Sequence, residues 1–282
     1  MAARVEKAEA AIAAEFAEAA RARGKSVLLE PIAGTTAVYG GPGEPFNKVV
    51  GLGFAGPIEE PVLAALEAKY DARGAEIRVE QSSLADPSVA AMLTRRGYEL
   101  IGYENVLGLA LTPALVDGMS RQMQQDATAG IEIARAREDE TRLWIETVTD
   151  AFLQPDSFDG PPPTETFARE VLIDVYEGLT ATNSNVLYLA RRGGEVAGGG
   201  AMRIADGLAQ LSGAATVPSH RRRGVQSALL RARLVDAASH GCDLAVVTTE
   251  PASKSQQNVQ RAGFALLYPR AILKRRAKGD RG

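Results

Sequence analysis

The chain has 282 residues, a length typical of two domains, and its 45% hydrophobic and 24% charged residues are those of an ordinary globular protein. A net charge of −3 argues against a dedicated nucleic-acid binder, so any cationic site has to be local. One cysteine excludes an internal disulfide framework, and two dispersed histidines give no zinc motif. No apolar run approaches the roughly 18 residues of a membrane span, and we expect a cytoplasmic protein with no membrane partner.

The N-terminal segment 2–24 predicts an amphipathic helix. Val5, Ala8, Ile12 and Phe16 fall on one side of it. Four glutamates interrupt the segment, which argues against a signal or transit peptide. We therefore expect a helix that docks on the body of the protein.

The remaining elements of the first half follow from hydrophobic periodicity and from glycine punctuation. We expect a helix at 59–74, a strand at 75–81, a helix at 86–97 and a strand pair at 98–111. The polar segment 112–130 ends in glycine and marks the junction between two units. The predicted domains are 1–118 and 130–282, with a linker at 119–129.

The second half repeats this order after additional elements of its own. These are a strand at 131–137, a helix at 139–152, a loop "FDGPPPTE" at 158–165, a helix ending near 179, and strands at 186–192, 195–205 and 208–217. The repeated part comprises a helix ending at His240, a strand at 243–250, a helix at 252–263 and a strand pair at 264–276.

Spacing supports a duplication. Gly74 and Gly97 lie 23 residues apart, while Gly241 and Gly263 lie 22 apart, and "RRGYEL" in the first half corresponds to "RAGFAL" in the second. The matching order of elements, the matching spacing and the strand pair that follows in each half together predict two related tandem domains.

Three consecutive arginines precede the helix that begins near residue 225, in "SHRRRGVQSALL". A helix N-terminus carries partial positive charge and unpaired N–H groups, so acidic residues are usual there. Added arginines indicate that a ligand supplies the negative charge. Glycine at 224 permits a close approach, and the N–H groups from Arg222 to Ser227 are placed to converge on an anion.

With its flanking elements, this turn resembles the signature Q/R-x-x-G-x-G/A of the GCN5-related N-acetyltransferase (GNAT) superfamily. Arg221 matches the first position and Gly224 the fourth, while Gln226 stands where glycine or alanine is usual. The resemblance covers residues 131–275 well and the first half only in architecture. It implies an α/β (α+β) fold of two tandem GNAT-like domains, each a mixed, mostly antiparallel twisted sheet flanked by helices, with a degenerate first domain.

The resemblance also implies acetyl-CoA as acyl-donor substrate, without a metal. The pyrophosphate would lie on the arginine turn and the pantetheine arm along the preceding strand. The residues it assigns to cofactor binding are Ala215, Thr216, Val217, Arg221, Arg222, Arg223, Gly224, Val225, Gln226, Ser227, Ser255 and Asn258.

The usual catalytic side chains of the family are missing. Gln210 stands in the place of the common glutamate base, and Val259 in that of the common tyrosine acid. We consider Glu250 as a substitute base and Tyr268 as a substitute acid. A helix-capping role for Glu250 and a half-buried strand position for Tyr268 are the alternatives.

These features predict an acyl-CoA-dependent N-acyltransferase. It would transfer acetyl to an amine of a small molecule or peptide by direct attack in a ternary complex. The alternative is a catalytically silent acyl-CoA-binding or regulatory protein. Nucleic-acid binding through "RRRG" and the tail "LKRRAKGDRG" is disfavoured by the acidic total. The 158–165 loop is expected to line the acceptor pocket, and a homodimer is compatible with the sequence. Glu59 and Glu60 replace the arginines in the first half and would repel a pyrophosphate.

Overall fold

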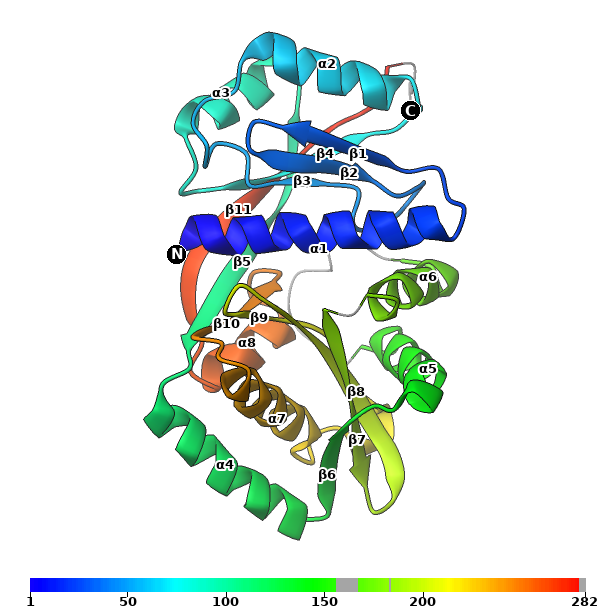
Figure 1. Cartoon of the computed structure of the whole chain (residues 1–282), viewed down its shortest axis with the longest axis vertical. Helices are drawn as coiled ribbons and strands as arrows, with labels where there is room; N and C mark the ends of the chain where they lie inside the picture. The colour runs from blue at the N-terminus through cyan, green and yellow to red at the C-terminus, as the bar shows by residue number, and fades with distance from the viewer. Residues whose placement is uncertain (156–166, 183, 279–282) are drawn as a thin grey trace.

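The computed structural model describes residues 1–155, 167–182 and 184–278 (Figure 1). The 158–165 loop, predicted to line the acceptor pocket, lies outside the described residues. The first half contains α1 (Ala2–Ala22), β1 (Leu28–Ile32), β2 (Thr35–Tyr39), β3 (Val49–Val50), α2 (Glu60–Asp71), β4 (Ile77–Ser82), α3 (Pro87–Arg95), β5 (Glu99–Ala110) and α4 (Pro113–Thr128). The second half contains β6 (Ile131–Arg135), α5 (Thr141–Phe152), α6 (Arg169–Thr180), β7 (Asn185–Arg192), β8 (Glu195–Ala205), β9 (Leu208–Thr216), α7 (Val225–Ser239), β10 (Leu244–Thr249), α8 (Lys254–Arg261) and β11 (Ala265–Arg275).

All strands of the described residues join one sheet of eleven strands. Their order is β1-β2-β3-β4-β11-β5-β10-β9-β8-β7-β6. Neighbouring strands are antiparallel except for β3 with β4 and β9 with β10, which are parallel. The predicted α/β class, with a mixed and mostly antiparallel sheet flanked by helices, is confirmed.

Each half carries the same run of elements. In the first half it is β3–α2–β4–α3–β5, and in the second it is β9–α7–β10–α8–β11. Each run contains the one parallel strand pair of its half, joined by a crossover helix. The duplication read from glycine spacing therefore has a counterpart in the architecture.

The last strand of each run is exchanged between the halves. β5 pairs with β10 of the second half, with Asn105 opposite Thr249. β11 pairs with β4 of the first half, with Arg270 opposite Ser82. Because β5 and β11 also pair with each other, the two halves share a continuous sheet.

The expected strand pairs at 98–111 and 264–276 are each one long strand (Figure 1). β11 carries a register shift between Leu266 and Tyr268, which bends the strand without ending it. Pro269 is accommodated beside this irregularity, so its missing N–H does not divide the strand.

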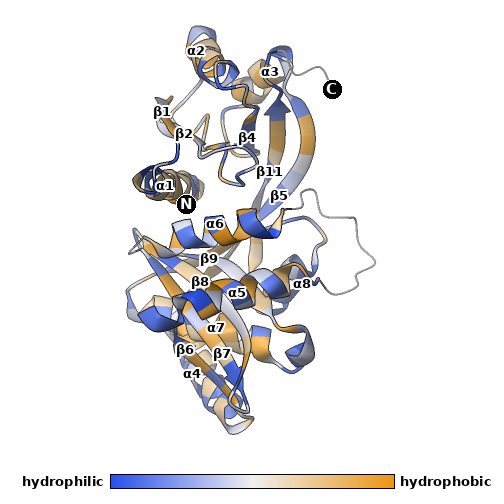
Figure 2. Cartoon of the chain, turned by 90° about the vertical axis from the view of Figure 1, so that its right-hand side faces the viewer, coloured by the Kyte–Doolittle hydropathy of each residue, from blue (hydrophilic) through white to orange (hydrophobic). Residues whose placement is uncertain are grey.

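Helices cover both faces of the second-half sheet. A Cβ on Gly199 of β8 would meet Trp144 of α5, whereas one on the next residue, Gly200, would meet Arg233 of α7. Successive strand residues point to opposite faces, so α5 and α7 lie on opposite faces. Figure 2 shows α5 and α6 side by side over the second half, with α1 seen end-on above them.

Helix α1 lies across the junction of the two halves (Figure 1). Val5, Ala8, Ile12 and Phe16 are buried, and Val5 and Ala8 pack on a cluster that includes residues of β5, β9, β10 and β11. The predicted docking helix is confirmed.

Helix α1 also contributes to a buried set of charges, here called the junction cluster: Glu6, Glu80, Glu104, Lys48 and Arg270. Arg270 is fully buried and lies 2.8 Å from a carboxylate oxygen of Glu6, 3.6 Å from Glu80 and 3.5 Å from Glu104. Lys48 lies 3.2 Å from Glu80. Charges from α1, β4, β5 and β11 thus meet beneath the helix.

The junction segment 112–130 is helix α4 and not an irregular linker. The side chain of Thr112 accepts a hydrogen bond from the Leu115 N–H, and Pro113 occupies the first turn, so the helix has a regular start. Only Met119 is buried along α4, which explains the weak apolar periodicity of the segment. The ion pair between Asp126 and Arg231 fastens α4 to α7.

Candidate active site

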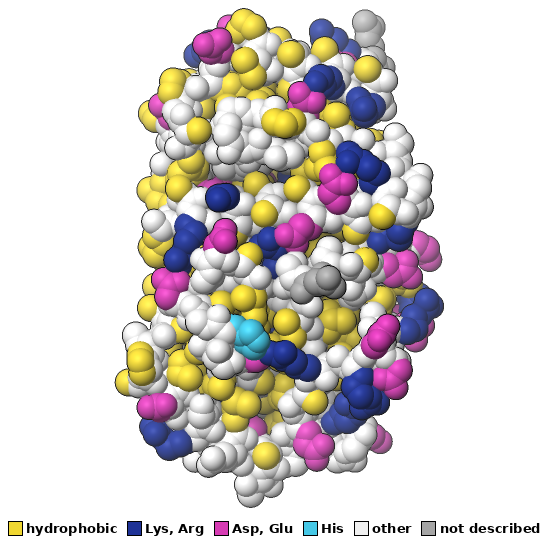
Figure 3. Space-filling model, viewed as in Figure 1, with side chains coloured by type: hydrophobic (Ala, Val, Ile, Leu, Met, Phe, Trp, Pro, Cys, Tyr) yellow, Lys and Arg dark blue, Asp and Glu magenta, His cyan; other side chains and the backbone are white. Residues whose placement is uncertain are grey.

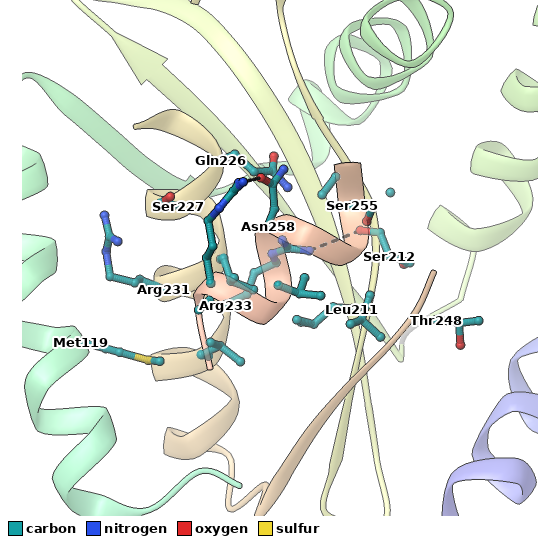
Figure 4. A pocket seen from close by; sticks show the side chains of 18 of the residues that line it. Met119, Leu211, Ser212, Gln226, Ser227, Arg231, Arg233, Thr248, Ser255 and Asn258 are labelled. Carbon is teal, nitrogen blue, oxygen red and sulfur yellow. Dashed lines mark hydrogen bonds between the residues drawn. The ribbon is translucent and has the colours of Figure 1, made fainter. Parts of the chain in front are cut away.

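Strands β9 and β10 diverge after a short paired region. They are in register only from Leu208 with Leu244 to Gln210 with Val246. Beyond these residues the backbone N–H and C=O groups that face the opening have no partner strand among the described residues. A cavity of about 490 Å³ fills this opening and extends between α7 and α8 (Figure 4). Its lining includes Met119, Tyr176, Leu211, Ser212, Gly213, Gln226, Ser227, Arg233, Val247, Thr248, Ser255, Asn258 and Val259. A cavity of this size is typical of ligand sites.

The turn before α7 presents unpaired donors at one end of this cavity. Within the described part of the chain, the backbone N–H groups of residues 222–227 donate no hydrogen bond. The chain turns here through left-handed backbone at Arg222, with φ of 58°, and at Gly224, with φ of 84°. Six successive N–H groups at the N-terminus of a fifteen-residue helix form a site suited to an anion.

The three arginines of the turn have two different roles. Arg221 donates from Nε to the carbonyl of Thr216 at 3.1 Å and from Nη2 to that of Ala151 at 3.1 Å, and it also binds the Gln154 carbonyl. It therefore ties the turn to β9 and to the end of α5. Arg222 and Arg223 are exposed and, among the described residues, make no hydrogen bond or ion pair. Arg222 and Arg223 are thus available to a ligand, whereas the guanidinium of Arg221 is engaged.

This difference predicts opposite effects on stability. Arg221→Gln is expected to lower the free energy of unfolding by about 1–3 kcal/mol, because half-buried carbonyls lose charged donors. Arg222→Gln is expected to change it by less than about 0.5 kcal/mol, as for an ordinary surface position. Urea denaturation followed by circular dichroism measures both. Equal stability of the two variants would contradict the structural role of Arg221.

The other predicted cofactor residues are distributed along the opening. Gln226 and Ser227 of α7 and Ser255 and Asn258 of α8 line the cavity (Figure 4). Ala215, Thr216 and Val217 lie on the adjacent stretch of β9 and its end, outside the cavity lining. The side-chain amide oxygen Oε1 of Gln226 accepts a hydrogen bond from the Thr216 hydroxyl at 3.4 Å. Gln226 therefore points back toward β9, and it links the turn to the strand.

Residues 144–264 match the family model described as Acetyltransferase (GNAT) family. The second half of the chain is a GNAT domain. None of the curated proteins compared with the chain matches it.

Solved structures extend the likeness to both halves. A GCN5-related N-acetyltransferase from Kribbella flavida is similar over 94% of this chain and 94% of its own, with 17% identity and a TM-score of 0.59. A tandem GNAT protein from the clavulanic acid biosynthesis pathway is similar over 89% of this chain and 83% of its own, with 13% identity and a TM-score of 0.57. A functionally unknown conserved protein from Staphylococcus epidermidis is similar over 77% of this chain and 79% of its own, with 8% identity and a TM-score of 0.54. At these identities the likeness establishes the fold.

The usual catalytic places of the GNAT domain hold groups that do not transfer protons. Gln210 is buried, accepts a hydrogen bond from Arg203 at 2.8 Å and donates one to Glu9 of α1 at 3.3 Å. Val259 is a buried apolar residue of the cavity wall. A carboxylate does stand beside Gln210, but Lys48 lies 2.8 Å from Glu9 and holds the pKa of that carboxyl at about 2. Glu9 is consequently a weak base.

The two substitute candidates occupy different environments. Glu250 directly follows β10 at the open end of the strand pair and is half-buried, although it is not part of the cavity lining. Tyr268 is 2% exposed, lies under α1, and donates its hydroxyl proton to Glu6 at 2.7 Å. Burial and the Glu6 charge raise the pKa of Tyr268. The expectation of Tyr268 as general acid is corrected on this geometry, because its hydroxyl is buried and engaged away from the cavity.

The first half lacks the GNAT anion turn. Glu59 is the N-cap of α2, Glu60 lies in its first turn, and Pro61 has no N–H to offer. A Cβ at Gly53 would lie 2.9 Å from the Asp86 backbone nitrogen, so the start of α3 fills the space beside this turn. Glu60 is paired with Arg96 at 2.8 Å. Packing and charge both oppose a phosphate here.

Among the described residues, no group of three His, Cys, Asp or Glu side chains is placed to hold a metal ion. Across the same ranges, no helix combines the length and apolarity required to cross a membrane.

Arg233 is a charged residue of the cavity wall that the sequence analysis did not predict. It interrupts an apolar stretch of α7 and is 2% exposed. A signal was available in β8, where three consecutive glycines, residues 198–200, leave space for large side chains on both faces.

Proposed function

We propose that the chain is an N-acyltransferase that uses acyl-CoA, with acetyl-CoA as the expected donor, and acylates an amine of a small molecule or peptide. The observation that carries this proposal is the run of N–H groups at residues 222–227, which donate no hydrogen bond to any described residue. Beside them, Arg222 and Arg223 have no partner within the same part of the chain. This site opens onto a cavity that reaches the divergence of β9 and β10. A pyrophosphate on a long, narrow arm matches such a layout.

The diverging strands supply the remaining contacts in this proposal. The pantetheine arm would lie along β9 past Ala215, Thr216 and Val217, with Ser255 and Asn258 of α8 on the other side. A backbone N–H of the unpaired β9 edge would polarise the thioester carbonyl. The amine nitrogen attacks the carbonyl carbon, the carbon–sulfur bond breaks, and the amine proton leaves while the thiolate gains one.

Glu250 is our candidate for the base that receives the amine proton. Glu250→Gln is expected to lower kcat about 100-fold with the acetyl-CoA dissociation constant unchanged, because the side chain acts on the acceptor and not on the donor. A thiol-release assay over an amine panel measures kcat, and calorimetric titration measures donor binding. Glu132→Gln, an exposed acidic site on β6, is the matched control. Full activity of Glu250→Gln would remove Glu250 from the proton path and leave that path to water.

The absence of a proton-transferring side chain at Gln210 and Val259 favours a second candidate, a silent acyl-CoA-binding or regulatory protein. Micromolar acetyl-CoA binding with no turnover on any amine would support it. No acetyl-CoA binding to the folded chain would overturn both functions. Basic and acidic side chains are intermingled on the face shown in Figure 3, which shows no continuous basic surface of the kind that nucleic acid requires.

A further inference from the structure

The cavity crosses the sheet through the gap between β9 and β10. Its lining includes Gln226 and Asn258 on the side of α7 and α8, and Phe152 and Tyr176 on the side of α5 and α6. Because α5 and α7 cover opposite faces of the sheet, one ligand can enter from each face and the two can meet in the gap. If the donor pyrophosphate lies at the α7 turn, the side of α5 and α6 is left to the acceptor.

Packing fixes the ring of Tyr176 beside β9. The residue is 7% exposed, and its ring meets that of Trp144 edge to face, with the two centroids 5.3 Å apart. Gly213 of β9 has a φ of 54°, and a Cβ there would lie 3.3 Å from Trp144 and 3.5 Å from Tyr176. Gly213 borders the cavity and follows Gln210, the last β9 residue paired with β10, by three positions. The Tyr176 ring therefore lies beside the stretch of β9 where the two strands diverge.

The Tyr176 hydroxyl is available to a ligand. It forms no hydrogen bond with a described residue, yet it is not among the polar atoms that are fully enclosed without a partner, and Tyr176 borders the cavity. Burial raises the pKa of this hydroxyl to about 12, so the group stays protonated at neutral pH. A tyrosine hydroxyl both donates and accepts hydrogen bonds. It can therefore bind the nitrogen of an uncharged amine.

Phe152 supplies an apolar surface on the same side of the cavity. It is the last residue of α5, borders the cavity and is 51% exposed. A ligand that covers such a ring gains the burial of apolar area, and a second aromatic ring adds about 0.5–1.5 kcal/mol through edge-to-face or offset contact. A molecule with an aromatic ring and an amine would use both Phe152 and the Tyr176 hydroxyl.

We propose that the acceptor is an amine carried on an aromatic body, with its ring against Phe152 and its nitrogen at the Tyr176 hydroxyl. The proposal rests on the proposed acyl-CoA function and narrows its acceptor. The neutral amine donates an N–H hydrogen bond to the Tyr176 oxygen, so the nitrogen lone pair stays free to attack the thioester carbonyl carbon. The carbon–sulfur bond then breaks, the nitrogen releases a proton to Glu250 or water, and the thiolate takes up a proton from solvent. Tyr176 positions the amine and transfers no proton itself.

3-Phenylpropylamine and propylamine form a matched pair of acceptors. They differ only in a phenyl group, which lies too far from the nitrogen to change its basicity much. With acetyl-CoA as donor, a thiol-release assay of the full chain is expected to give 3-phenylpropylamine a kcat/KM at least about ten-fold above that of propylamine. Turnover of amines without this preference would overturn the inference and leave the proposed function intact. No turnover of any amine would overturn both.

Variants of the α5 end locate the ring contact. Phe152→Ala changes an exposed side chain and is expected to reduce the ratio of the two kcat/KM values about five-fold. Leu153→Ala is the matched control, because Leu153 is also exposed but lies outside the cavity lining, and it should keep the native ratio. A native ratio in Phe152→Ala, or an equal loss in Leu153→Ala, would contradict contact between Phe152 and the acceptor.

Tyr176→Phe tests the amine contact, because it keeps the ring and removes only the hydroxyl. It is expected to lower kcat/KM for both amines about ten-fold, while calorimetric titration shows an unchanged acetyl-CoA dissociation constant. Tyr103→Phe removes an exposed hydroxyl on β5 and should leave all three values as in the native chain. Native kcat/KM in Tyr176→Phe, or a weakened affinity for acetyl-CoA that accounts for the loss, would overturn the role of Tyr176.

Discussion

A variant carrying Arg222→Glu and Arg223→Glu is expected to bind coenzyme A at least about 100-fold more weakly than the native chain, with its fold unchanged. Both side chains are exposed and unpaired within the described residues, so no native contact is lost on substitution. Each reversal removes a charge-assisted contact worth about 1.5–3 kcal/mol and places a carboxylate beside the phosphates. The two changes together are therefore expected to weaken the free energy of coenzyme A binding by more than about 2.7 kcal/mol, which corresponds to about two powers of ten in the dissociation constant.

A control with the same change in net charge separates local contact from long-range attraction. Arg95→Glu with Arg121→Glu alters two exposed arginines on α3 and α4, and coenzyme A affinity is expected to remain within about two-fold of native. Calorimetric titration at 150 mM salt measures both double variants. If coenzyme A binding were weakened equally in both double variants, net charge, and not contact with the α7 turn, would govern binding.

The largest effect on stability is expected from Arg270→Met, which should lower the free energy of unfolding by about 3–5 kcal/mol at pH 8. Arg270 is fully buried and is the central cation of the junction cluster, in contact range of Glu6, Glu80 and Glu104. Methionine retains the volume of the side chain but leaves three buried carboxyl groups with less compensating charge.

This loss is expected to depend on pH. Burial and the Glu80 charge already raise the pKa of Glu104 to about 7, and burial raises that of Glu6. Without Arg270 these pKa values rise further, so the folded state retains protons that the unfolded state releases near pH 4.5. A state that binds more protons is favoured at low pH, and the stability of the variant falls as pH rises through and beyond that range.

Urea denaturation at pH 5 and pH 8 measures the difference. The penalty of Arg270→Met should be clearly smaller at pH 5. Arg275→Met, on the same strand, breaks a half-buried ion pair with Asp71, whose pKa is lowered. Its penalty should be small and nearly equal at the two pH values, since Asp71 stays ionised at both. A penalty for Arg270→Met that is independent of pH would contradict carboxyl desolvation as its cause.

Local physical rules predicted much of the molecule. The α7 turn follows from Gly224 and its arginines, the helix ends at Gly74 and Gly241 are present, and the apolar stripe of α1 is buried. These features depend on residues close in sequence, where backbone conformation and periodicity are determined locally. The same rules grouped Arg221 with Arg222 and Arg223 as ligand-binding residues, whereas in the structure its guanidinium binds the carbonyls of Thr216 and Ala151.

Tertiary pairing was not predictable in this way. β5 and β11 follow similar helices and have similar apolar character, so nothing in either strand specifies which half it completes. The environment of Tyr268 depends on that exchange and on α1, which brings Glu6 from the other end of the chain. The buried position of Arg233 depends on glycines of β8, more than thirty residues away in sequence, as the hydrogen bond to Ala201 illustrates.

The exchange of β5 and β11 has a consequence for synthesis of the protein. As the chain leaves the ribosome, β4 emerges early, but its partner β11 emerges only after the whole GNAT domain. Until then β4 keeps an unpaired edge, and β5 has neither of its final neighbours, β10 and β11. An open strand edge is prone to pair with other chains. The first half is therefore expected to need protection during translation, and a chain released before residue 265 should aggregate instead of yielding a folded first half.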